Sequence, residues 1–211
     1  MELGRRSLWY TLGMNTEIEV KFLNIDHAEI RLKLQEIGAI CETPLVLMKR
    51  AIIDYPDRRL QAGSPNSYIR VRDEGNKISL TYKQFDSLSI DGAKEVELTV
   101  SSFEDAIKIF TSVGLEVVSF QESKRETWRL NDCEIVLDEW PWLKPYIEIE
   151  ADSEAIIKEV SAKLELGWAD AMFGDVMVAY RAQYPYLNPE QTIGRIAEVR
   201  FDAPFPELLK A

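Results

Sequence analysis

The chain has 211 residues, of which 46% are hydrophobic and 29% are charged, a composition typical of a folded globular protein rather than a disordered or collagen-like one. Its formal net charge of −11 at neutral pH argues against general nucleic-acid binding, which needs surplus positive charge on the surface. Any basic cluster must therefore be local. No apolar run approaches the roughly 18 residues of a membrane span, so we expect a cytoplasmic protein that does not bind membranes.

The chain has too few cysteines and histidines to indicate a disulfide framework, a zinc site or a Ser-His-Asp catalytic triad. Cys41 and Cys133 are far apart and outside any CxxC pattern, so neither a disulfide framework nor a zinc site is indicated. His27 is the sole histidine, which excludes Ser-His-Asp catalysis and leaves acid–base chemistry to carboxylates, lysine or tyrosine. From its place at the edge of a predicted helix, we expect His27 to lie on the surface.

The first predicted elements are a strand and a helix. Residues 1–13 show no clear period, and we interpret them as a disordered leader or an upstream start, because the patterned sequence begins after a second methionine. Residues 15–22 alternate between apolar and charged side chains, which predicts a strand. The capping box formed by Asp26 and Glu29 predicts a helix that ends at Gly38.

Strand patterns separated by turn residues dominate the remaining sequence. They cover residues 45–55, 67–72, 77–83, 94–100, 123–130, 134–138 and 146–150. Helices are predicted at 102–113, after Ser153 and through 169–182. These elements predict an α+β fold, a closed or nearly closed antiparallel β-barrel with flanking helices. We expect residues 14–183 to form this domain and residues 184–211 to form a C-terminal tail packed on it.

Full charges occupy the polar positions of these strands. A solvent-facing sheet surface favours threonine, serine and mixed polar residues, so this density suggests one shared charged surface, although a solvated face remains the alternative for any single strand. The charged positions are Glu17, Glu19, Lys21, Arg70, Arg72, Lys83, Glu95, Glu97, Arg125, Asp138, Glu148 and Glu150.

A barrel with these faces inward would have a polar interior, and its buried charges would need partners. Arginine and lysine suit a polyanion, and clustered carboxylates suit Mg²⁺ or Mn²⁺, which bridge phosphate oxygens. The charges therefore predict a triphosphate site.

Six segments, in order, carry a resemblance to a known superfamily. They are EIEVK at 17–21, YIRVR at 68–72, YKQ at 82–84, KEVEL at 94–98, KRETW at 124–128 and LDEWPWLKPYIEIE at 137–150. The first has the form E-x-E-x-K, a weak signal alone, but the ordered set resembles the CYTH superfamily of triphosphate tunnel metalloenzymes. This superfamily includes thiamine triphosphatases, inorganic triphosphatases and class IV adenylyl cyclases.

The resemblance implies a role for each charged position. Metal ligands would be Glu17, Glu19, Asp138, Glu148 and Glu150. The phosphate chain would be held by Lys21, Arg70, Arg72, Lys83 and Arg125. Supporting roles fall to Glu95 and Glu97, for which a salt-bridged strand face is the alternative, and to Lys124, which lies on the opposite strand phase from Arg125. The implied cofactor is Mg²⁺ or Mn²⁺.

Two aromatic features bear on the same site. Family members often have an aromatic residue in the second long strand, where this chain reads MKRAIIDYPD, so any role of a tyrosine there depends on Tyr55. Trp140 and Trp142 are expected to be packing residues rather than platforms for base stacking.

The function implied is metal-dependent hydrolysis of a small-molecule triphosphate by positioning and electrostatic stabilisation. Lys83, close to Arg70 and Arg72, is the candidate general base if neighbouring cations depress its pKa. One alternative is a class IV adenylyl cyclase, although the chain lacks an obvious His-Phe pair ahead of EIEVK. The other is a non-catalytic polyphosphate- or nucleotide-binding module, which would gain nothing from inward acids. The organic group on the triphosphate, and the choice between monomer and homodimer, stay open.

Overall fold

The computed structural model describes residues 14–63 and 66–211, so the expectation for residues 1–13 lies outside the described residues. The strands are β1 (Asn15–Glu17), β2 (Glu19–Leu23), β3 (Ile40–Asp54), β4 (Asn66–Asp73), β5 (Ile78–Phe85), β6 (Ala93–Val100), β7 (Glu116–Leu130), β8 (Cys133–Glu139), β9 (Tyr146–Glu150) and β10 (Glu198–Val199). The α-helices are α1 (His27–Glu36), α2 (Phe103–Ser112), α3 (Glu154–Lys163) and α4 (Met177–Gln183), and short 3₁₀ helices lie at Trp168–Asp170, Ile193–Arg195 and Glu207–Leu209.

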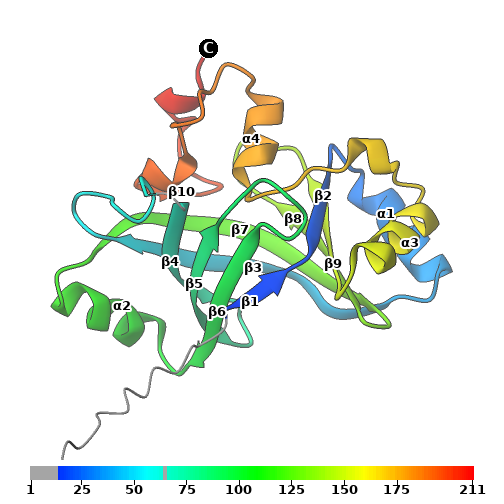
Figure 1. Ribbon diagram of the computed structural model, residues 1–211, viewed down its shortest axis with the longest axis horizontal. Coiled ribbons are helices and arrows are strands. Elements are labelled where there is room, and N and C mark those ends of the chain that lie inside the picture. Colours follow the sequence, from blue (N-terminus) through cyan, green and yellow to red (C-terminus); the bar gives the residue numbers. More distant parts are fainter. Residues whose placement is uncertain (1–13, 64–65) are drawn as a thin grey trace, which may run out of the picture.

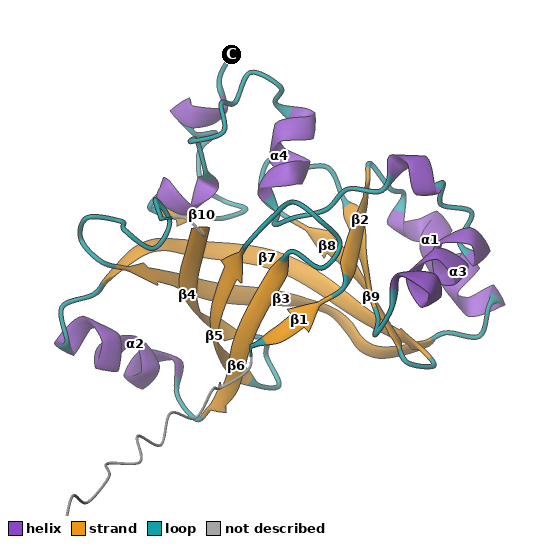
Figure 2. Cartoon of the chain, viewed as in Figure 1, coloured by secondary structure: helices purple, strands orange, loops and turns teal. Residues whose placement is uncertain are grey.

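The described strands form one 10-stranded sheet that curls back on itself (Figures 1 and 2). Its order is β1-β6-β5-β4-β3-β7-β8-β9-β2, with β10 added in parallel to β7 and all other pairs antiparallel. The two ends of this order, β1 and β2, are separated in the chain only by Ile18. Because one short peptide joins both edges, the sheet is a nearly closed barrel. The predicted α+β barrel fold is confirmed.

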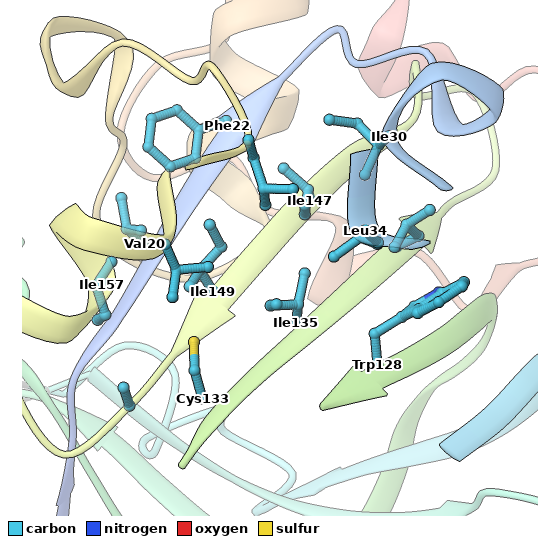
Figure 3. Packing of buried hydrophobic residues seen from close by; sticks show 14 residues of the cluster. Val20, Phe22, Ile30, Leu34, Trp128, Cys133, Ile135, Ile147, Ile149 and Ile157 are labelled. Atoms are coloured by element: carbon cyan, nitrogen blue, oxygen red, sulfur yellow. The ribbon is translucent and has the colours of Figure 1, made fainter. Parts of the chain in front are cut away.

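The outer face of β2, β8 and β9 is apolar and packs against α1 and α3, as Figure 3 shows. The cluster includes Val20, Phe22, Ile135, Ile147 and Ile149 from the strands, with Ile30, Leu34 and Ile157 from the helices. These strand positions alternate with the charged ones, and burying each large side chain contributes about 1.5–3 kcal/mol. Burial of the apolar side chains on the outer face therefore keeps the charged side chains, which alternate with them, facing the barrel interior.

Helix α1 begins and ends where the sequence predicts. The Asp26 side chain accepts hydrogen bonds from the backbone N–H groups of Ala28 (2.8 Å) and Glu29 (3.3 Å), and Gly38 follows the helix with φ of 81°. The expectation that His27 lies on the surface is wrong. Its ring Nε2 donates to the carbonyl oxygen of Tyr146 on β9 (3.0 Å), so packing of α1 on the barrel buries the imidazole.

The residues after α3 form short helices, turns and a short strand, and residues 175–177 and 192–194 among them line the cavity. The helix predicted through 169–182 is wrong in its first half, because Met172 pairs in a β-bridge with Lys21 and Gly174 has φ of 118°. Helix α4 then packs with the tail in one apolar cluster, which includes Trp140, Tyr146, Tyr180, Ile193, Val199 and Leu209. Among the described helices, none has the length and apolar character that crossing a membrane requires.

Candidate functional site

The barrel encloses a cavity of about 430 Å³, a volume within the range of small-molecule sites, roughly 300 to 1,000 Å³. Of the sequence-predicted site residues, the cavity is lined by Glu17, Glu19, Lys21, Arg70, Arg72, Lys83, Glu95, Glu97, Arg125, Asp138, Glu148 and Glu150. Lys124 lies outside it, partly exposed and 3.4 Å from Glu139. Lys124 therefore lies on the opposite face of its strand from the cavity residue Arg125, as the alternation predicts.

Lys21 lies between two carboxylates on neighbouring strands. The β2–β9 register places Lys21 opposite Glu148 and Glu19 opposite Glu150. The buried Lys21 Nζ is 3.1 Å from Glu19 Oε1 and 3.2 Å from Glu148 Oε1. Burial alone would raise the pKa of Glu148, but Lys21 and Arg125 outweigh it and lower the pKa to about 2. Glu148 is therefore ionised at neutral pH.

Arg125 is held in a fixed orientation by the acids around it. Its Nε and Nη2 donate to the two oxygens of Asp138 (2.7 and 2.5 Å), and Nη2 also donates to Glu148 (2.9 Å). The fully buried Asp138 accepts a further hydrogen bond from the Tyr146 hydroxyl (3.3 Å). In this arrangement Asp138 is a partner of Arg125, and its role as a metal ligand stays a prediction.

Lys83 on β5 is ion-paired with Glu17 on β1, and the two strands are separated in the sheet by β6. Burial alone would lower the pKa of Lys83, but the carboxylates of Glu19 and Glu17 outweigh burial and raise it above the ordinary value for lysine. A general base at neutral pH needs a depressed lysine pKa. The condition set for Lys83 as a base is therefore not met in this structure, because its nearest charged groups are anionic rather than cationic.

A surplus of negative charge collects beside these pairs. Burial, followed by the charges of Glu17 and Glu19, raises the pKa of Glu150 to about 8. Burial and Glu17 raise the pKa of Glu95 to about 7, and its buried Oε2 has no hydrogen-bond partner among the described residues. Repelling carboxylates of this kind fit a divalent cation with oxygen ligands. In residues 14–63 and 66–211, no three acidic, histidine or cysteine side chains are grouped as a metal site. Lys21 pairs with Glu19 and Glu148, and Lys83 pairs with Glu17.

Arg70 and Arg72 extend from β4 into the cavity, and acids contact both. Arg70 Nη2 donates to Thr81 Oγ1 (3.2 Å) and lies 3.7 Å from Glu97. The guanidinium of Arg72 binds Glu74 through Nε (3.0 Å) and Nη2 (2.9 Å). Glu97 also lies 3.5 Å from Lys77, the salt-bridged arrangement given above as the alternative for this residue.

Several residues of the cavity were not predicted from the sequence. They include Gln61, Tyr68 and Glu74, the segment 192–194 of the tail, and above all Arg50, while Trp140 was expected only as a packing residue. Arg50 lies between Met48 and Ile52 on the face of β3 that points into the barrel. The sequence could not show which face of this strand points inward, because both faces are apolar. Tyr55 does not line the cavity, and its ring instead packs against Arg59.

Several solved structures share the fold of this chain. The barrel resembles that of a Pyrococcus horikoshii OT3 protein (TM-score 0.63, 23% identity, 77% of this chain and 98% of that chain). It also resembles a candidate adenylate cyclase of Vibrio parahaemolyticus (0.66, 15%, 79% and 98%). A third similar structure is HpAC1 of Hippeastrum, a candidate adenylyl cyclase described as having a dominant triphosphatase activity (0.52, 14%, 83% and 99%).

At these identities the likeness shows the fold alone. No curated protein matches the sequence significantly. The sequence pattern of the CYTH domain, however, matches residues 15–167, the segment that supplies every strand from β1 to β9 and therefore most of the cavity wall. The chain belongs to the CYTH domain family.

Proposed function

We propose that this protein hydrolyses a triphosphate inside the barrel, with Mg²⁺ or Mn²⁺ as cofactor. The observation that carries the proposal is that one cavity is lined by two interleaved clusters, one of guanidinium and ammonium groups and one of carboxylates. In the second cluster, burial and the charges of neighbouring acids raise the pKa values of Glu95 and Glu150. A polyphosphate with a bound divalent cation is complementary to both clusters. A pure anion-binding module would need only the first cluster.

The residues divide into two proposed groups. Lys21, Arg70, Arg72, Lys83 and Arg125 bind the phosphate oxygens, and Glu17, Glu19, Glu148 and Glu150 hold the cation. The bound cation would neutralise developing charge on the phosphates and lower the pKa of coordinated water. Lys83 remains a phosphate-binding residue, because its raised pKa keeps it cationic. Asp138 orients Arg125 through the paired hydrogen bonds between them.

The direct test is turnover with purified protein and inorganic triphosphate, thiamine triphosphate or ATP, each with Mg²⁺, Mn²⁺ or EDTA. Hydrolysis of inorganic triphosphate releases one phosphate and one diphosphate, and we expect it to require the divalent cation. Formation of cyclic AMP and diphosphate from ATP would instead identify a cyclase. Binding without turnover under all conditions would identify a non-catalytic module, and undiminished hydrolysis in excess EDTA would refute the metal assignment.

Arg72→Lys is expected to lower kcat/KM on inorganic triphosphate tenfold or more, about 1.4 kcal/mol, with little change in Tm. Glu74 contacts two nitrogens of the Arg72 guanidinium, Nε and Nη2, and Arg72 lines the cavity. A lysine ammonium cannot keep the Glu74 contact and reach a phosphate in the same way. Steady-state kinetics and thermal unfolding measure both quantities.

A suitable control for this variant is Arg58→Lys, because Arg58 pairs with Glu116 (3.6 Å) away from the cavity. Its kinetics should match the wild type. Normal kinetics with a lowered Tm in Arg72→Lys would assign Arg72 to the scaffold rather than to the substrate.

A further inference from the structure

Arg50 differs from every other arginine that faces the cavity. Ion pairs connect Arg70 to Glu97, Arg72 to Glu74 and Arg125 to Asp138, whereas in the described part of the chain Arg50 forms none. It is only 6% exposed. Its Nη2 donates to Ser123 Oγ (2.5 Å), and its buried Nε has no hydrogen-bond partner among the described residues.

The neighbours of Arg50 make its buried positive charge still less favourable. The β3–β4 register sets Arg50 directly opposite Arg72, and burial followed by the charges of Arg72, Arg70 and Arg125 lowers the pKa of Arg50 to about 9. At neutral pH it is still a cation. An isolated buried charge is strongly unfavourable unless a partner compensates it.

No described group of the protein fills that role. The guanidinium carbon lies 4.3 Å from the centroid of the Trp140 ring, but a cation–π contact contributes only about 0.5–2 kcal/mol. Asp138, an acid whose charge favours the cationic form of Arg50, has both oxygens bound to Arg125. The missing partner is therefore an anion that enters the cavity.

We propose that Arg50, packed on Trp140 and lining the cavity beside Arg72, forms a phosphate-binding position that adds to those of the charged motifs. The inference rests on the proposed function, because the anion is a phosphate group of the triphosphate substrate. The fork of N–H donors matches phosphate oxygens, and Nε and Nη1 remain free to donate. Residues Arg50, Arg70 and Arg72 then contact one continuous phosphate chain.

Arg50→Met separates this role from a structural one, because methionine keeps the apolar contact with Trp140 and removes the charge. Without ligand, the Tm of the variant should be a few degrees above wild type, since an uncompensated cation is lost. The Tm increase that inorganic triphosphate produces in EDTA, where no turnover occurs, should shrink. In Mg²⁺, kcat/KM should fall about tenfold.

The matched control is Arg31→Met. Arg31 donates to the buried Glu126 through Nε (2.9 Å) outside the cavity, so its loss strands a carboxylate and should lower Tm without changing the ligand-induced shift or the kinetics. The same behaviour in Arg50→Met would overturn the proposal. If Arg50→Met does not fold, Arg50→Gln, which keeps a donor to Ser123, is measured in the same way.

Different results would refute the proposed hydrolysis and the proposed phosphate-binding position of Arg50. Wild-type protein that triphosphate stabilises in EDTA but that has no turnover with any metal would refute hydrolysis, while the comparison of Tm shifts would still decide the role of Arg50. Equal Tm shifts in wild type and Arg50→Met would refute the Arg50 position and leave hydrolysis standing. No Tm shift at all in wild type would overturn the Arg50 proposal.

Discussion

Glu148→Gln is expected to lower kcat/KM on inorganic triphosphate on the order of 100-fold and to raise the Mg²⁺ concentration needed for half-maximal activity. Glu148 lies between two cations of the cavity, because it contacts both Lys21 (3.2 Å) and Arg125 (2.9 Å). With its pKa lowered to about 2, it carries a full charge at neutral pH. Glutamine keeps the shape and removes that charge. Initial rates over a Mg²⁺ series measure both effects.

Glu139→Gln is the control for this experiment. Glu139 lies one strand away and pairs with Lys124 (3.4 Å) outside the cavity, so its Mg²⁺ dependence should match that of the wild type. If Glu148→Gln showed the wild-type rate and the wild-type Mg²⁺ requirement, Glu148 would be neither a ligand nor an organiser of the site.

Asp138→Asn is expected to lower the free energy of unfolding by about 3–5 kcal/mol, the typical loss when one partner of a buried ion pair is removed. Asp138 is fully buried and accepts two hydrogen bonds from Arg125, so asparagine would remove the doubly bonded partner of a buried guanidinium and leave only Glu148 paired with it. Urea unfolding followed by circular dichroism measures the change. Asp86→Asn, which removes an exposed partner of Lys94, should change stability little.

The same variant separates the two roles considered for Asp138. Loss of stability, with an unchanged Mg²⁺ requirement of the protein that remains folded, assigns Asp138 to Arg125. Wild-type stability with a raised Mg²⁺ requirement would instead make Asp138 a metal ligand, as the family resemblance implies.

Much of the fold could be predicted from local patterns. The alternation of Glu17, Glu19 and Lys21 with Val20 and its neighbours shows which side chains share a face, because successive strand residues point to opposite sides of a sheet. Repeated on several strands, that alternation identified many of the charged residues that line the cavity and placed Lys124 on the opposite face from Arg125. Capping by Asp26 is equally local and was equally predictable.

Only the tertiary structure decided which charges meet. Lys83 pairs with Glu17 because the barrel brings together β5 and β1, which lie far apart in the chain, and this proximity reversed the pKa shift required of a general base. Packing of α1 on β9 buried His27 through a contact with Tyr146. Strand periodicity carries no information about such partners, because they depend on register and closure.

Arg50 shows most clearly which properties follow from the sequence and which depend on the tertiary structure. Its residue type was visible in the sequence, but the segment around it is apolar on both faces, so the pattern gave no reason to place it in the cavity. Its register opposite Arg72, and its lack of an acidic partner within residues 14–63 and 66–211, are properties of the assembled barrel. The sequence by itself determined the kind of surface that this protein presents to a ligand, because alternation is local. The balance of charge on that surface was decided by the tertiary structure, because electrostatic energy depends on distances between residues remote in the chain.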